Sequence, residues 1–135
     1  MVTFFVADQI FGLSAYKVRD VLRAQPLTRV PLAAAEIAGA INLRGHIVTA
    51  IDVRARLGAP AAPADASHMC VVVERSGEQF CLVVDAVGDV ITVDSVDIEP
   101  TPSFLPTAWA QVSGGIYRMQ ERLLLLLDVE QLLSY

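Results

Sequence analysis

The stretch Ile41-Asn42-Leu43-Arg44-Gly45-His46-Ile47-Val48 places polar residues inside a segment that is otherwise apolar and β-forming. It predicts two strands, within residues 41–53, that are joined at Arg44-Gly45. An arginine at such a turn presents a planar fork of five N–H donors, and arginine is enriched among residues that dominate interface energies. The stretch therefore favours a hairpin whose turn takes part in binding, while a plain turn with an exposed arginine would also explain the spacing.

Short β-type runs separated by turns dominate the chain on both sides of this hairpin. Two more hairpins are predicted, from residues 3–7 with 10–13 around Asp8-Gln9, and from 69–74 with 79–84 around Ser76-Gly77. Further strands are predicted at residues 15–23 (where a short helix fits equally), 87–93 and 122–128. Short helices are predicted at residues 52–57 and 128–133, and a helical turn at 33–38.

A weak internal repeat relates the two halves of the chain. Residues 11–22 align with 80–91 at five identical positions out of twelve, and Ile51-Asp52-Val53 matches Leu127-Asp128-Val129. The stretch 58–67, rich in alanine and proline, is typical of an exposed connector. Unless the repeat is only the chance similarity of aliphatic strands, it predicts two small β-barrel lobes, at about 1–60 and 66–135, between which strands can be exchanged.

The composition excludes several classes of protein. Of the 135 residues, 54% are apolar and 19% are charged, which excludes intrinsic disorder. No apolar run approaches the roughly 18 residues that a membrane span needs, so the surplus apolar surface favours contact with partner proteins. Residues 1–60 hold seven basic and four acidic residues, whereas 61–135 hold three and eleven. The excess of acidic residues argues against nucleic-acid binding. The difference between the two halves suits two faces of opposite electrostatic potential, and solubility alone would also explain it.

A search for catalytic and metal-binding residues yields little. His68, Cys70 and Cys81 are the best candidate ligands, but their spacing is not that of a zinc site. Neither a phosphate-binding glycine loop nor a Gly-x-Ser-x-Gly motif is present. The sequence therefore favours a binding module without catalytic residues, metal or cofactor over a small enzyme or metal-dependent thiol protein. The first residues do not resemble a signal peptide, which predicts a cytoplasmic protein with reduced thiols.

Several of these segments, in this order and spacing, resemble the CheW-type chemotaxis coupling proteins. The resemblance is carried by Phe11-Gly12-Leu13, residues 37–54 with Asn42-Leu43-Arg44-Gly45, Val83-Val84-Asp85-Ala86-Val87, and residues 123–128. It implies one CheW-like domain over residues 1–135, mostly β, with two SH3-like five-stranded β-barrel subdomains and a few short helices.

The resemblance also implies a function. Such proteins are non-enzymatic adaptors that couple the cytoplasmic tips of methyl-accepting chemoreceptors to the regulatory domain of the histidine kinase CheA, in the cytoplasm and at receptor arrays. An adaptor of another chemosensory system, which controls pilus motility or a non-motility output, fits the sequence as well.

Six residues are implied as the receptor- and kinase-binding site: Val18, Asp20, Gly39, Asn42, Arg44 and Gly45. We expect Arg44 to pair with Asp20 across neighbouring strands and to shape the groove between the barrels, where the family places the helical receptor tips. The family more often has Glu at the position of Asp20, and the shorter side chain leaves open a water-bridged pair or none. A barrel edge near residues 47–51 is implied to face the kinase.

Overall fold

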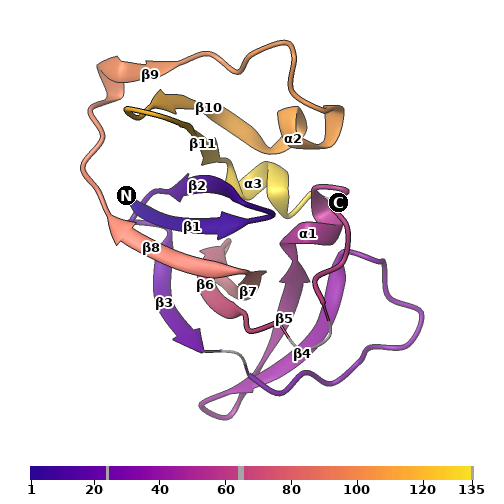
Figure 1. Ribbon diagram of the computed structural model, residues 1–135. Coiled ribbons are helices and arrows are strands. Elements are labelled where there is room, and N and C mark those ends of the chain that lie inside the picture. Colours follow the sequence, from indigo (N-terminus) through magenta and orange to yellow (C-terminus); the bar gives the residue numbers. More distant parts are fainter. Residues whose placement is uncertain (24, 64–65, 135) are drawn as a thin grey trace.

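The computed structural model describes residues 1–23, 25–63 and 66–134, and nearly half of them belong to the strands of two β-sheets (Figure 1). One set of strands comprises β1 (Val2–Val6), β2 (Gln9–Leu13), β8 (Ala86–Val90), β9 (Ile98–Glu99), β10 (Ser113–Arg118) and β11 (Leu123–Leu127). The other comprises β3 (Val18–Arg23), β4 (Ile37–Leu43), β5 (His46–Asp52), β6 (Met69–Arg75) and β7 (Glu78–Val84). Their orders are β8-β1-β2-β11-β10-β9 and β3-β6-β7-β5-β4. The prediction of a mostly β fold is confirmed.

Each sheet takes strands from both copies of the repeat. The hairpin β1–β2 pairs with β8 and β11, and the hairpin β6–β7 pairs with β3 and β5. In each sheet one of the two pairs that join the copies is parallel, with Phe11 opposite Leu125 and Thr49 opposite Phe80, and the other, β1–β8 or β3–β6, is antiparallel. The division into two sheets therefore does not coincide with the connector at 58–67. Residues 64 and 65 of this connector lie outside the described part. The lobes exchange strands, as the sequence allows.

The chain that follows one edge strand of each sheet returns to the opposite edge. After β3, Thr28 forms a bridge with Ala40 in β4, and after β8, strand β9 pairs with β10. A bulge glycine with positive φ lies at each return, Gly39 (153°) and Gly115 (124°). An added Cβ would lie 2.6 Å from the Thr28 carbonyl oxygen at Gly39 and 2.8 Å from that of Glu99 at Gly115. Only glycine allows these close approaches, which bring the two edges of each sheet toward each other.

The largest apolar cluster is shared by the two sheets. Phe4 and Phe11 stack with ring centroids 5.7 Å apart in the six-stranded sheet, and Ile51, Val71 and Leu82 of the five-stranded sheet belong to the same buried cluster. Full burial of one such side chain stabilises the fold by about 1.5–3 kcal/mol. Because this core is common, the two sheets stabilise each other.

Three short helices cover this core: α1 (Val53–Arg56), α2 (Thr107–Val112) and α3 (Val129–Leu132). The 3₁₀ turn η1 (Ser95–Asp97) has no buried residue and is not part of this cover. The repeated Asp-Val pair explains two of the three helices. Asp52 accepts a hydrogen bond from the Ala55 N–H at the start of α1, and Asp128 accepts one from the Glu130 N–H at the start of α3. Both carboxylates are therefore N-caps, as aspartate is favoured to be.

Two local predictions are corrected. The first hairpin turns at Ala7-Asp8, both with positive φ, so the turn lies one residue earlier than predicted. Residues 33–38 do not form a helical turn, because β4 begins at Ile37 and pairs with Ile51 of β5, and sheet pairing overrides the helix preference of alanine. The ambiguous segment 15–23 contains strand β3, and the helix α2 was not predicted. No helix among the described residues is long and apolar enough to cross a membrane.

Candidate functional site

The turn between β4 and β5 holds Arg44 in an unusual backbone conformation. Leu43 pairs with His46, so Arg44-Gly45 is a two-residue loop, and both loop residues have positive φ, 52° and 86°. Such turns match the twist of a hairpin, but a side-chain-bearing residue in this region costs about 1–2 kcal/mol. The Asn42 Oδ1 accepts a hydrogen bond of 2.9 Å from the Gly45 N–H and supports the loop. The turn therefore fixes Arg44 at the tip of the hairpin.

Arg44 forms an ion pair with Asp20. Its Nη2 donates to Asp20 Oδ2 at 2.9 Å, while Asp20 Oδ1 accepts from the Val21 N–H at 2.9 Å. The expected pair is present, but its expected placement across neighbouring strands is wrong: β3 and β4 are the opposite edges of the five-stranded sheet. The pair spans the gap between the edges, where the Arg44 side chain is 75% exposed and that of Asp20 29%.

Two of the six predicted site residues support the sheet from within. Val18 is half-buried opposite Val73 and packs against the shared core. Gly39 is buried at the β4 bulge, against the Thr28 carbonyl. The structure therefore brings Asp20, Asn42, Arg44 and Gly45 together at one end of the hairpin. Gly39 lies toward the other end of the hairpin, opposite Ala50, and Val18 lies at the start of β3.

An exposed apolar residue lies beside this turn. Ile47 is opposite Asn42 in the hairpin and is 74% exposed, whereas the next residue, Val48, is buried. A hollow of about 380 Å³ next to Ile47 is lined by His46, Glu74 and Glu78, among others. The six predicted site residues do not include Ile47, although it begins the segment 47–51 that is implied to face the kinase, because two consecutive apolar residues do not show which of them faces outward. We call Asp20, Asn42, Arg44, Gly45 and Ile47 the Arg44 surface.

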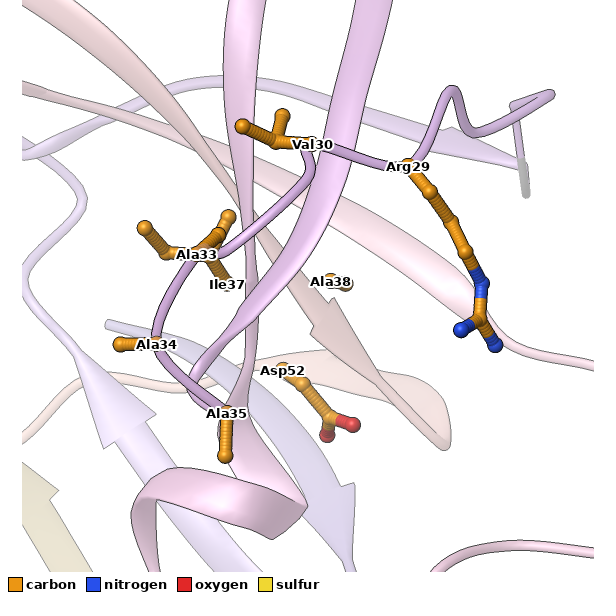
Figure 2. Close-up of a pocket in the computed structure, with 8 residues that line it drawn as sticks. All are labelled: Arg29, Val30, Ala33, Ala34, Ala35, Ile37, Ala38 and Asp52. Carbon is orange, nitrogen blue, oxygen red and sulfur yellow. The ribbon is translucent and has the colours of Figure 1, made fainter.

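A second hollow lies at the other end of the same hairpin (Figure 2). It has a volume of about 390 Å³, and its walls include Ala33, Ala34 and Ala35. The Asp52 carboxylate beside it is already the N-cap of α1, and the Arg29 side chain extends away from the alanines (Figure 2). Because β4 rises about 3.3 Å per residue, the hollow is roughly 20 Å from Arg44. It is not part of the Arg44 surface.

The candidate metal ligands do not assemble. Over residues 1–23, 25–63 and 66–134, no three His, Cys, Asp or Glu side chains are grouped so as to hold a metal ion. Cys70 and Cys81 are free and buried. The neighbouring Cys70 thiol, together with burial, raises the pKa of the Cys81 thiol. His68 instead lines a hollow with Asp85 and Arg54.

Comparisons with known proteins agree over nearly the whole chain. The family model described as CheW-like domain matches residues 1–135. A probable chemotaxis protein CheW of Rhizobium etli is 34% identical over 99% of this chain and 86% of its own length. The chemotaxis protein CheW of Rhizobium meliloti is 33% identical over 96% and 84%. The crystal structure of the scaffolding protein TtCheW from Thermoanaerobacter tengcongensis superposes with a TM-score of 0.88 at 30% identity, covering 99% of this chain and 91% of that one.

Proposed function

The chain belongs to the CheW-like domain family, and from this membership we propose that it is a scaffold of a chemotaxis signalling assembly that acts by binding proteins rather than by catalysis. The names of its relatives and the scaffolding role of its structural neighbour support the proposal. Two sheets that share one core make a rigid body with separate faces, which is what a scaffold needs.

We further propose that the Arg44 surface binds the regulatory domain of a CheA-type histidine kinase or the helical tip of a chemoreceptor. The observation that carries this proposal is the Asp20–Arg44 pair. A strained turn presents the exposed arginine, and a carboxylate from the opposite sheet edge orients it. Strain of this kind is typical of functional positions. Ile47 adds exposed apolar area beside it, and Arg44 adds donors that suit carboxylates or carbonyl groups of a partner.

Calorimetric titration tests the proposal. The protein is titrated with the regulatory domain of a CheA-type kinase from the same genome, and separately with a soluble fragment of a receptor tip. We expect micromolar or tighter binding to at least one of them, with a negative heat-capacity change that reports apolar burial. Arg44→Ala should weaken that binding about tenfold, which is about 1.4 kcal/mol.

The matched control is Arg118→Ala. Arg118 also forms an exposed ion pair, with Glu99 at 2.6 Å, but it lies in the six-stranded sheet. If Arg118→Ala weakens binding as much as Arg44→Ala, the Arg44 surface is not the contact. If the parent protein binds neither the kinase domain nor the receptor fragment, the proposed partners are wrong.

A further inference from the structure

Asp85 occupies the shortest crossing between the two sheets. It is the single residue between β7, in the five-stranded sheet, and β8, in the six-stranded sheet. Its backbone N–H donates to the Phe5 carbonyl, and its Oδ2 accepts from the Ala7 N–H at 2.8 Å. The backbone and the carboxylate of Asp85 therefore both hold the β1–β2 hairpin.

Arg54 reaches the same carboxylate from the five-stranded sheet. It lies in α1, directly after β5, and donates through Nε to Asp85 Oδ1 at 2.9 Å and through Nη2 to Oδ2 at 2.7 Å. Its Nη1 also donates to the Pro60 carbonyl at 2.8 Å. With side chains 21% and 28% exposed, this is the least exposed ion pair among the described residues. Two-point pairing of this kind fixes orientation as well as distance.

The repeat shows that this connection exists on one side of the molecule only. In the alignment, Arg54 corresponds to Glu130 and Asp85 to Tyr16, which is 90% exposed. The other crossing between the sheets, residues 14–17, is four residues long and exposed throughout. The residues at the other crossing therefore cannot form a second ion pair of this kind. One crossing is held by the contacts of Asp85 with Arg54 and with the β1–β2 hairpin, which we call the clamp, and the other crossing has no such ion pair.

We propose that Arg54 is a positioning residue, which sets the orientation of the two sheets through Asp85 so that partners bound on different faces are held together. The inference rests on the proposed function, since only a scaffold with two partners needs a fixed angle between its faces. The Arg44 surface keeps its binding residues when the clamp is broken, because the Asp20–Arg44 pair lies wholly within the five-stranded sheet. Loss of the clamp therefore weakens simultaneous binding of two partners and leaves the affinity for a single partner unchanged.

The orientation itself is tested first, without any partner. Spin labels are placed on Glu78→Cys, in β7, and Gln120→Cys, in the exposed β10–β11 turn, while Cys70 and Cys81 are buried. We expect one narrow distance distribution in the parent protein and one at least twice as wide in Arg54→Lys. Lysine keeps the charge but cannot make the two-point contact. Asp85→Asn, which keeps the side-chain shape, should widen the distribution as well.

Arg118→Lys is the matched control, because the Arg118–Glu99 pair joins β10 and β9 within one sheet. It should leave the distribution narrow. Circular dichroism checks that every variant is folded at the temperature of measurement. If Arg54→Lys and Asp85→Asn both leave the distribution as narrow as in the parent, the clamp is refuted, whatever the protein binds.

Joint binding is then measured on unlabelled proteins. With the kinase domain and the receptor fragment together, we expect Arg54→Lys to lower recovery of the three-component complex at least fivefold, with each single affinity within twofold of the parent. Equal losses in the single affinities would show a merely structural role and overturn the positioning role. If the parent protein binds no partner at all, the proposed function fails, and the label distances still decide whether the clamp exists.

Discussion

The guanidinium of Arg44 and the carboxylate of Asp20 meet at 2.9 Å, although they come from opposite edges of one five-stranded sheet. The contact exists because the sheet curls, so that the β4–β5 turn approaches β3. Its energy as an exposed pair is small, about 0–1 kcal/mol. Its value is geometric, since it orients the arginine of a strained turn.

A double-mutant cycle measures this relationship. Arg44→Ala and Asp20→Ala should each weaken partner binding, and the double variant should bind no worse than Arg44→Ala alone, because Asp20 acts by orienting Arg44. The free energy of unfolding should change by less than about 1 kcal/mol in each single variant. Calorimetry and chemical denaturation give the two quantities. Strictly additive losses in binding would show that the two residues act independently.

Gly39 is predicted to matter for folding rather than for contact. Gly39→Ala places a Cβ 2.6 Å from the Thr28 carbonyl oxygen at a φ of 153°, so we expect a loss of about 3 kcal/mol in the free energy of unfolding. Gly58→Ala is the control, because its φ is 68° and nothing lies within 4 Å of the added Cβ. That variant should lose about 1 kcal/mol. Equal losses in thermal or urea unfolding would contradict the close approach at Gly39.

The stability of the protein should depend on pH through Asp85. The bidentate hydrogen bonds from Arg54 hold the pKa of Asp85 below its ordinary value of 3.8, and the Ala7 N–H lowers it further. A carboxylate with a lowered pKa contributes stability that is fully present above the ordinary value and is lost as pH falls through the folded-state value. Urea unfolding between pH 7 and pH 3 should therefore show a smaller acid-induced loss for Asp85→Asn than for the parent. Parallel curves would contradict this contribution.

The two cysteines should react slowly while the protein is folded. Cys70 and Cys81 are both buried, which keeps reagents away from them. The neighbouring Cys70 thiol and burial raise the pKa of the Cys81 thiol, whereas the Cys81 thiol lowers the pKa of Cys70 to about 7, so that Cys70 is protected by burial alone. A chromogenic thiol reagent should label neither residue at the rate of free cysteine at pH 7, and it should label both promptly in denaturant. Fast labelling of either thiol in the native protein would show that the cluster around them opens easily.

Local structure follows from local residues in several places. The Ser76-Gly77 turn pairs Cys70 with Val83 and Val72 with Cys81, as the two-residue loop predicts. The Asp-Val pairs begin helices because an aspartate side chain caps free N–H groups one turn ahead. The predicted helical turn at 33–38 fails because its last two residues lie in β4, where Ile37 pairs with Ile51 of β5, and a propensity of tenths of a kcal/mol per residue does not outweigh a sheet ladder.

The observed strand bounds show one local cause of the exchange of strands. A hairpin needs at least two residues in its loop, but only Asp85 separates β7 from β8. Strand β8 therefore cannot fold back on β7 and continues into the other sheet. The repeat by itself shows only that the two halves contain similar strands, and similar strands pair equally well within one copy or between copies.

The sequence does not predict β9, β10 or α2. It does predict the other strands and their hairpins, the short helices at 52–57 and 128–133, the turn that carries Arg44, and the family of the protein. These depend on residues close together in the chain, or on motifs whose order survives in relatives. The tertiary structure alone places Asp20 against Arg44 across the sheet edges, and Arg54 against Asp85 at the crossing between the sheets. Such contacts depend on the twist and curl accumulated over several strands, and no spacing between residues in the sequence records that sum.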